Sequence, residues 1–401
     1  MISTRILVVH NTYQLRGGED SVVEAEVALL RSRGHAVEVF QRHNDALKSM
    51  PRWQAAMDTV WSKNVIADLT ETIERFEPDV VHFHNTFAQI SPGAYWAVQA
   101  AGLPVVQTLH NFRLHCPQGN YLRDGQVCEE CLGHSPLRGV MRGCYRDSKA
   151  MSAVLGSMLV FHRSLGTYRN KVTRYIALNE FCRGKFIEGG LPADRIVLKP
   201  NFVDFAPPPP AARNGFLYVG RLSSEKGVDS MVRAWSLMDT GSLRVAGTGP
   251  ESGLLENQPR LTALGALSGE AVRAEMGSAL ALVLPSICYD SFPRTLVEAF
   301  ACALPVIASR LGPLAELIEE GETGLLFMPG DATDMAQKLD WAQAHPEKMA
   351  EMGRNARKKY ETEFSADRNY KQLVTIYEDA IYQLAQESDR RIGTLQVTAG
   401  G

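Results

Sequence analysis

Short runs of apolar residues alternate with longer amphipathic segments along most of the chain. Each apolar run ends at a turn or a polar residue, as buried strands of a parallel sheet do, and the next segment has helical spacing. The runs that predict strands are Arg5–His10, Ala36–Phe40, Asp79–His84, Val105–Leu109, Tyr175–Leu178, Arg195–Lys199, Phe216–Val219, Leu243–Ala246, Ala281–Leu284 and Pro305–Ala308. This alternation predicts an α/β fold built on doubly wound parallel sheets.

The proline run Pro207–Pro210 is the clearest boundary in the chain, because consecutive prolines form a stiff, extended linker. It predicts a first Rossmann-like domain over residues 1–206 and a second over residues 207–370. Residues 331–390 predict helices, and we treat residues 371–401 as a separate C-terminal segment. In the first domain, a helix is also expected over Leu47–Trp61.

Composition places the chain among ordinary globular proteins. It has 401 residues, of which 45% are hydrophobic and 22% charged, so two or three domains with real cores are expected. The net charge of −3 does not point to a class of partner. No apolar run is long enough to span a bilayer, and residues 1–10 lead directly into the first strand. We therefore expect a cytoplasmic protein with reduced cysteines and no nucleic-acid partner.

The stretch Leu280–Ser309 predicts a strand, a loop, a helix over Thr295–Cys302 and a second strand. It carries two acids, Asp290 in the loop and Glu298 in the helix. Because ligands of open parallel sheets bind outside the carboxyl ends of the strands, these acids are placed to meet a ligand's hydroxyl groups. The alternative is a capping acid at 290 and a solvated helix acid at 298.

A basic, glycine-bounded turn follows the strand Phe216–Val219. Its sequence is Gly220-Arg221-Leu222-Ser223-Ser224-Glu225-Lys226-Gly227. Arg221 and Lys226 offer positive charge to a diphosphate, and the glycines allow close backbone approach. A second glycine turn, Gly247-Thr248-Gly249, is expected at the same edge. Ordinary surface cations are the alternative to a diphosphate site.

The first domain offers two features at the corresponding edge of its sheet. Gly17-Gly18 precedes a helix, so its backbone N–H groups can face an anion, although a glycine pair also simply makes a tight turn. His110 and Asn111 follow the strand Val105–Leu109 and reach the carboxyl edge. The alternative for His110 is a half-buried histidine bonded to the backbone.

The segment 112–150 lacks periodicity and contains Cys116, Cys128, Cys131 and Cys144. Four cysteines in one loop of a cytosolic protein can hold a structural zinc ion, which would leave no open position for catalysis. Free thiols and a disulfide are the alternatives.

The region Arg138–Lys185 has ten basic residues and two acids, a surplus of eight positive charges, around the apolar helical stretch Met151–Phe161. Apolar and basic residues together suit the surface of an anionic membrane, whereas a core helix beside a solvated basic face is the alternative.

Two of these motifs carry a resemblance to a known family. The Asp290–Glu298 pair before ALPVIA, and the G-R-L-x-x-E-K-G turn, resemble the signatures of retaining glycosyltransferase family 4. That family has Glu where this chain has Asp290, and Gly where it has Ala303. The resemblance implies the GT-B fold, in which two Rossmann-like domains face each other across a cleft and the final helix crosses back to the first domain.

The resemblance also implies roles for particular residues. His110 and Asp290 would contact the donor sugar, Arg221 and Lys226 the diphosphate, and Glu298 the nucleotide ribose; we take these five as the catalytic set. The residues expected to contact donor or acceptor are Gly17, Gly18, Asn111, Asn201, Gly220, Gly247, Gly249, Ser291, Phe292, Pro293, Arg294 and Thr295.

The implied reaction is transfer of a hexose from a nucleoside-diphosphate sugar to a glycan or lipid-linked acceptor, with retention at the anomeric carbon. The chain has no D-x-D motif, the usual carboxylate platform for a catalytic metal, so we expect no catalytic cofactor. A pathway of polysaccharide or glycoconjugate synthesis and a place at the inner face of the cytoplasmic membrane are expected. A nucleotide-sugar epimerase and a non-catalytic sugar-nucleotide-binding protein remain the alternatives.

Overall fold

The computed structural model describes residues 3–14, 17–209 and 211–399, with the side chains of the last helix described to Glu387. The described residues form two compact units. Unit 1 contains the chain up to Gly119, Glu130–Lys199 and the chain from Asn369, whereas unit 2 contains Asn120–Glu129 and Pro200–Arg368. These divisions lie a few residues from the boundaries that the sequence suggests at 206 and 370.

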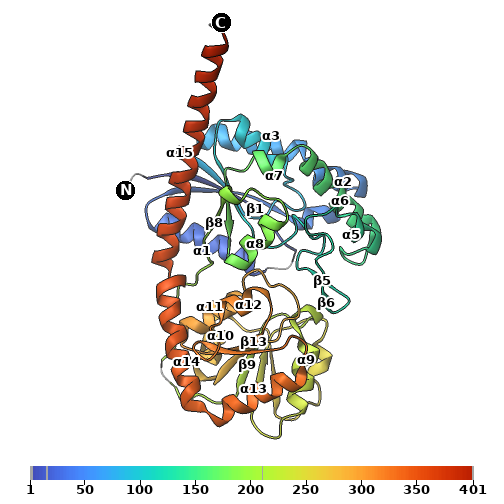
Figure 1. The fold of residues 1–401 in the computed structure, drawn as a ribbon, viewed down its shortest axis with the longest axis vertical. Coiled ribbons are helices and arrows are strands. Elements are labelled where there is room, and N and C mark those ends of the chain that lie inside the picture. The colour runs from blue at the N-terminus through green and yellow to red at the C-terminus, as the bar shows by residue number, and fades with distance from the viewer. Residues whose placement is uncertain (1–2, 15–16, 210, 400–401) are drawn as a thin grey trace. The chain divides into compact units, whose positions relative to one another are not determined.

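Unit 1 is built on a six-stranded parallel sheet (Figure 1). In spatial order its strands are β2 (Ala36–His43), β1 (Arg5–Thr12), β3 (Val80–Phe83), β4 (Val105–Thr108), β7 (Arg174–Ala177) and β8 (Ile196–Leu198). The apolar residues of β1, β3 and β4 are almost fully buried, because helices cover parallel sheets on both faces. The order reverses at β1 and β3, so their carboxyl ends form the expected ligand edge.

The helices of unit 1 follow their strands as the alternating pattern predicts. They are α1 (Gly18–Ser32), α2 (Arg52–Trp61), α3 (Lys63–Phe76), α4 (Ala94–Ala100), α5 (Leu137–Arg142), α6 (Lys149–Ser164), α7 (Thr167–Asn170), α8 (Glu180–Glu188) and α15 (Ala366–Ala399). The expected helix Leu47–Trp61 is wrong in its first turn. Asn44–Lys48 is a 3₁₀ helix, and α2 begins only after Pro51, whose ring cannot continue a preceding helix.

The C-terminal helix α15 belongs to unit 1, as the crossing helix of the GT-B fold requires (Figure 1). Its Tyr370 hydroxyl is 2.8 Å from Nε2 of His35, and its Tyr377 hydroxyl is 2.8 Å from Nδ1 of His82. Asp379 pairs with Arg174 of β7. Buried hydrogen bonds of this kind hold the helix to the sheet.

Unit 2 contains the second six-stranded parallel sheet. Its spatial order is β11 (Leu261–Gly265), β10 (Leu243–Ala246), β9 (Phe216–Val219), β12 (Ala281–Leu284), β13 (Val306–Ser309) and β14 (Gly324–Phe327). Counted along the chain, this is the order 3-2-1-4-5-6 of dinucleotide-binding sheets. Trp235, Phe216 and Phe327 lie in its core.

The helices around this sheet are α9 (Val228–Ser236), α10 (Gly269–Ser278), α11 (Arg294–Ala301), α12 (Gly312–Leu317), α13 (Ala332–Ala344) and α14 (Pro346–Lys359). A short hairpin, β5 (Leu122–Arg123) and β6 (Gln126–Val127), joins unit 2 from within the segment that shows no periodicity. It is held there by Tyr121, which is fully buried against the ring of Tyr289, and by the N–H of Tyr289, which donates to Asn120.

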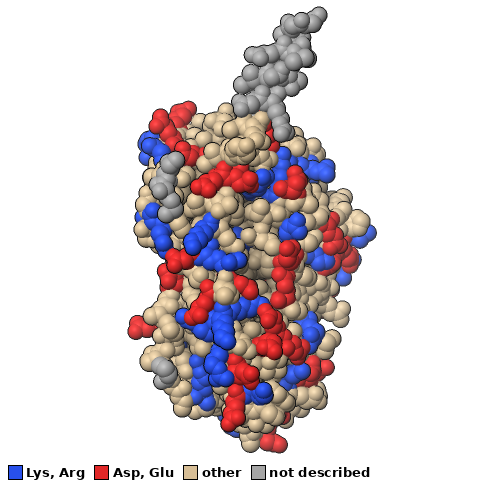
Figure 2. Space-filling view, turned by 60° about the vertical axis from the view of Figure 1, so that its left-hand side comes forward, with Lys and Arg blue, Asp and Glu red and all other residues tan. Residues whose placement is uncertain are grey.

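Two surface properties follow from these elements. Among the described residues, every helix is too short or too polar to cross a membrane. On the face drawn in Figure 2, Lys and Arg side chains are interspersed with Asp and Glu, in keeping with the small net charge.

Candidate active site

The carboxyl ends of β9 and β12 meet at the point where the strand order of unit 2 reverses. The loop after β9 passes through a 3₁₀ turn, Ser224–Lys226, and brings Lys226 to the loop after β12. There its ammonium group pairs with the Asp290 carboxylate, with 28% and 24% of the two side chains exposed. Burial lowers the pKa of Lys226, but the charge and hydrogen bond of Asp290 outweigh this effect, so the pKa is raised and the amine stays charged.

Glycine is required at three positions of this edge, Gly227, Gly247 and Gly249, because a Cβ at each would clash with a backbone carbonyl oxygen. Gly227 has φ of +72°, and a Cβ there would lie 2.0 Å from the carbonyl oxygen of Pro285. A Cβ at Gly247 would lie 1.8 Å from the carbonyl oxygen of Gly220. The close approach expected of these turns is therefore an approach of backbone to backbone, which draws the ends of β9, β10 and β12 together.

Glu298 and Arg294 lie one turn apart on α11. The Nε atom of Arg294 is 3.2 Å from Oε1 of Glu298. Burial raises the pKa of Glu298, an effect that Arg294 and Arg273 only partly offset. The side chain of Arg221 is exposed, and its carbonyl oxygen accepts a hydrogen bond from the Tyr218 hydroxyl.

The residues between Asp290 and the first turn of α11 differ in how far they are buried. Ser291 and Thr295 are half-buried, whereas Phe292 is buried with its ring 6.1 Å from that of Phe364. A ligand contact at Phe292 would therefore come from its backbone. Pro293 is the N-cap residue of α11, and Asn201 is buried with no hydrogen-bond partner for its Oδ1 atom among the described groups.

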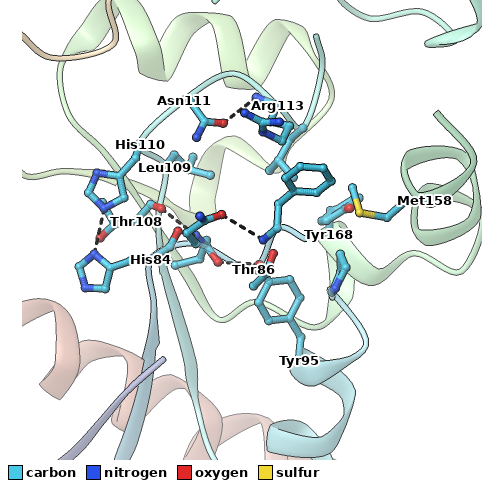
Figure 3. Close-up of a pocket in the computed structure, with 15 residues that line it drawn as sticks. His84, Thr86, Tyr95, Thr108, Leu109, His110, Asn111, Arg113, Met158 and Tyr168 are labelled. Atoms are coloured by element: carbon cyan, nitrogen blue, oxygen red, sulfur yellow. Dashed lines mark hydrogen bonds between the residues drawn. The ribbon is translucent and has the colours of Figure 1, made fainter. Parts of the chain in front are cut away.

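In unit 1, three histidines gather at the carboxyl ends of β1, β3 and β4. Nε2 of His110 lies 2.9 Å from Nδ1 of His84, as the dashed line in Figure 3 shows. His10 forms a 2.7 Å contact with Asp20 through Nε2. Burial, aided by the charges of His10 and Lys199, lowers the pKa of His110 to about 3, so this ring is neutral near pH 7.

Gly17 and Gly18 stand at the start of α1, where the sequence predicts an anion-facing turn. The N–H of Gly17 donates to Oδ2 of Asp20 at 2.8 Å, so this group is already bonded within the turn. A Cβ at Gly18 would meet no atom of the described residues within 4 Å. Space is therefore open beside Gly18.

Asn111 leads into a polar cluster beside His110. Its Oδ1 atom accepts from the backbone N–H of Arg113, whose guanidinium lies over the ring of Phe87. A cavity of about 50 Å³ lies here, and Figure 3 shows the side chains that line it. The Tyr13 hydroxyl donates to Glu19 at 3.1 Å, and burial raises the pKa of Glu19 to about 7.

All four cysteines of the predicted zinc site are unbridged. Cys116 and Cys131 are buried, and Cys128 and Cys144 are partly exposed. In the described part of the chain, the side chains that come within reach of one ion are Glu26, His82 and His84, which the sequence did not suggest as a group. Zinc at the cysteines stays a prediction.

Sequence reasoning missed several buried polar residues of unit 1. His10 ends the predicted strand Arg5–His10 and lies two residues before the end of β1, so its position was a usable signal. Asp20 lies two residues after the glycine pair and was overlooked. Glu26 and Lys199 are charged residues in otherwise ordinary element sequences, and only the structure shows that they pair.

Comparisons with known proteins show which family the chain belongs to. Residues 202–359 match the family "Glycosyl transferases group 1", and residues 16–206 match "Glycosyltransferase Family 4". The chain is 30% identical over 390 residues to a D-inositol 3-phosphate glycosyltransferase of Pseudarthrobacter chlorophenolicus, covering 85% of each protein. The chain belongs to glycosyltransferase family 4. Its alignments span less than half the length of other curated relatives, such as the N-acetyl-alpha-D-glucosaminyl L-malate synthase of Bacillus anthracis, with 29% identity over 41% of this chain and 45% of that protein.

Solved structures show the same GT-B fold. Anabaena HepE in complex with UDP superimposes with a TM-score of 0.66 at 18% identity, covering 92% of this chain and 98% of that chain. The sucrose-phosphate synthase of Thermosynechococcus elongatus gives a TM-score of 0.67 at 18% identity, covering 98% of this chain and all of that chain. The prediction of two Rossmann-like domains is confirmed.

Proposed function

We propose that this chain is a retaining glycosyltransferase that moves a hexose from a nucleoside-diphosphate sugar to a glycan or lipid-linked acceptor. The observation that carries the proposal is the Lys226–Asp290 pair at the reversal point of the unit 2 sheet. A fixed cation and a carboxylate side by side match the two ends of a donor, its diphosphate and its sugar hydroxyls.

Lys226 and Arg221 would stabilise the leaving group. As the bond between the anomeric carbon and the diphosphate oxygen breaks, negative charge grows on the distal phosphate, and cations already in place stabilise that charge. The N-terminus of α9, directly after Gly227, favours an anion at the same edge. HepE has been crystallised with UDP and with UDP-glucose, which makes UDP the first nucleotide to test.

The acceptor hydroxyl would add to the anomeric carbon on the face that the diphosphate leaves, and its proton would pass to the departing phosphate. No protein nucleophile is then required, and the configuration is retained. Asp290 would bind sugar hydroxyls, Glu298 would bind the ribose, and His110 would orient the hexose. Because His110 is neutral, it would act through hydrogen bonding rather than charge.

We also propose that unit 1 binds an anionic membrane through α2, α5 and α6, in keeping with a lipid-linked acceptor at the inner membrane face. Trp53 and Met57 of α2 are 67% and 63% exposed. The other exposed apolar side chains of this surface are Leu137, Met141, Met151, Val160 and Phe161. Lys63, Arg138 and Lys149 add positive charge beside them.

A groove of about 580 Å³ lies between α2 and α6 on this surface, lined by Met57, Val60, Trp61, Val154 and Phe161 among others. Large exposed apolar patches of this kind usually mark an interaction site. Several of the region's basic residues are already paired, for example Arg174 with Asp379 and Arg142 with Glu130, so the apolar side chains would contribute much of the binding.

The proposed reaction is tested first by thermal unfolding with UDP-, GDP- and ADP-sugars. A donor that binds only the folded protein and is present at a concentration of one hundred times its Kd stabilises the protein by about 2.7 kcal/mol. A sugar nucleotide that does not bind leaves Tm unchanged. The identified donor is then incubated with and without glycan and lipid-phosphate acceptors. A glycoside product supports the proposal, an altered sugar nucleotide without acceptor supports the epimerase, and binding without turnover supports a non-catalytic role.

A further inference from the structure

A row of four polar groups runs from the sheet interior of unit 1 to His110. Lys199, fully buried after β8, forms a 2.5 Å ion pair with Oε1 of Glu26 on α1 and lies 3.4 Å from Oδ1 of Asn369 on α15. Oε2 of Glu26 lies 3.6 Å from Nε2 of His84. His84 then contacts His110 through Nδ1, as Figure 3 shows.

The contact between Glu26 and His84 determines where His84 carries its proton. Oε2 of Glu26 and Nε2 of His84 are buried and have no hydrogen-bond partner among the described groups. If Nε2 were unprotonated, two acceptors would face each other in the protein interior, which is costly. A proton on Nε2 instead faces the carboxylate oxygen at 3.6 Å, so an N–H dipole meets a negative charge and the repulsion between two acceptors is avoided.

The proton on His84 in turn sets the state of His110. Burial lowers the pKa of His84 well below its ordinary value, so the ring carries one proton. With that proton on Nε2, Nδ1 of His84 is an acceptor, and Nε2 of His110 must donate to it. The neutral ring of His110 then has no proton on Nδ1.

We propose that Glu26, paired with Lys199, fixes the tautomer of His84 and through it that of His110, so that His110 offers Nδ1 as an acceptor to a hydroxyl of the donor sugar. The last part rests on the proposed function, whereas the tautomers do not. Glu26 and His84 are positioning residues, and His110 is the group that touches the substrate. No proton is transferred along the row.

The same region could be read as a metal site, because ligand atoms of Glu26, His82 and His84 lie within 4.8 Å of one another. The surroundings speak against this reading. The ammonium group of Lys199 already provides the cation that faces Glu26, and both ring nitrogens of His82 are bonded, to the hydroxyls of Tyr377 and Thr108. The Lys199–Glu26 ion pair, the electrostatic contact from Glu26 to His84 and the hydrogen bonds of His82 and His84 account for these groups.

The tautomers are measured directly by NMR on the full chain labelled with ¹⁵N-histidine, because protonated and unprotonated ring nitrogens have well-separated shifts. Assignment uses His84→Asn and His110→Gln. We expect His84 and His110 to be neutral at pH 7 with the proton on Nε2 in both. A proton on Nδ1 of His110, or two protons on either ring, would overturn the proposal. This measurement needs no donor.

The positioning role is tested with a near-isosteric pair, His84→Asn and His84→Leu. The Asn amide keeps an acceptor near the place of Nδ1, whereas Leu removes it. With the donor that the Tm screen identifies, we expect kcat to fall at least about tenfold in the Leu variant and to be largely restored by Asn, with little change in the affinity for the nucleoside diphosphate of that donor. Equal losses in both variants would overturn the role.

Replacing the Glu26–Lys199 ion pair tests whether Glu26 controls the tautomers. Glu26→Leu with Lys199→Met removes the ion pair without leaving a buried charge, and such replacements are often tolerated. In this double variant we expect mixed tautomers at His84 and His110, seen as averaged or doubled ring signals. If either variant does not fold, the wild-type spectrum alone still decides the tautomers. An unchanged single tautomer in the folded double variant would contradict control by Glu26.

Discussion

Lys226 forms an ion pair with Asp290 from the neighbouring loop, and both residues stand at the carboxyl edge of one parallel sheet. The two residues are 64 positions apart in the chain. They meet because β9 and β12 are adjacent in the sheet although two strands lie between them in sequence. This relationship turns two separate sequence motifs into one site.

Replacing Lys226 with Ala should lower kcat by roughly 10²-fold or more, because a preorganised cation that stabilises the leaving diphosphate is lost. The measurement is turnover at saturating donor and acceptor. Lys358→Ala, at an exposed position of α14, is the matched control and should leave kcat unchanged. Near-normal turnover in the Lys226 variant would contradict the assignment.

Replacing Glu298 with Gln should raise the Kd of the nucleoside diphosphate about tenfold, because hydrogen bonds to a charged group contribute ~1.5–3 kcal/mol. The wild-type Kd should also depend on pH. Since burial raises the pKa of Glu298, lowering the pH protonates this carboxylate earlier than an ordinary glutamate, and binding weakens.

Calorimetry from pH 8 to pH 5 tests both parts of this prediction. The Gln variant should lose the pH dependence that Glu298 causes, and Glu347→Gln, exposed on α14, should behave like the wild type. A Glu298→Gln Kd equal to that of the wild type at pH 8 would argue against ribose binding by this side chain.

Replacing Ala303 with Gly should stabilise the protein by about 0.5–1 kcal/mol. Ala303 follows the C-cap of α11 with φ of +53°, a left-handed conformation that favours glycine, and the N–H of Leu304 closes the turn onto Ala299. Urea unfolding gives the free-energy change. Ala301→Gly, inside the same helix, should have the opposite sign, and a loss of stability in both variants would contradict the prediction.

Unit 1 should bind liposomes that contain anionic lipid at low salt, and binding should weaken as salt screens the charges. Trp53→Ser with Met57→Ser should lower the partition coefficient at least about tenfold, because burying one such side chain contributes ~1.5–3 kcal/mol. Co-sedimentation measures it, with Trp341→Ser in α13 as control. Failure of the wild type to bind at low salt would exclude this surface.

Zinc should co-purify with the protein at one ion per chain if Cys116, Cys128, Cys131 and Cys144 hold it. Elemental analysis of reduced protein gives the ratio, and Cys131→Ser should lower it whereas Cys182→Ala should not. A chelator should leave initial turnover unchanged, with slow loss as unit 1 unfolds. Metal-free wild-type protein that is fully stable would exclude the zinc site.

Much of the fold could be predicted from the chain because buried parallel strands leave a clear signal. Ala281–Leu284 has the predicted bounds, and most other predicted strands are within about two residues of theirs. Strand β14 was not predicted, because its apolar run Gly324–Phe327 is short and stands among helices. Helices α10 and α12 were not predicted either. The hairpin β5–β6 was missed because its order comes from Tyr121, buried against a residue far along the chain.

Some residues of the candidate site could also be predicted from the sequence, whereas others could not. Lys226, Asp290 and Glu298 could be found because they stand in motifs with a known pattern, and the structure brings the first two together. The partners of His110 could not, since Glu26, His84 and Lys199 are distant in sequence and show no pattern. Only the parallel register of β1, β3 and β4, the packing of α1, and the end of β8 at Leu198 together place these side chains in one row.

The hydrogen bond between Lys199 and Asn369 has a consequence for how this chain is assembled. Apart from the excursion at 120–129, the chain leaves unit 1 after Lys199 and returns at Asn369, so this exit and return are fixed side by side. Residues 200–368 are therefore an insertion with neighbouring ends, and insertions of that kind tolerate excision. A short glycine-rich link from 199 to 369, with the β5–β6 hairpin also shortened because its partner Tyr289 is removed, should yield a domain that keeps α15 docked on its sheet.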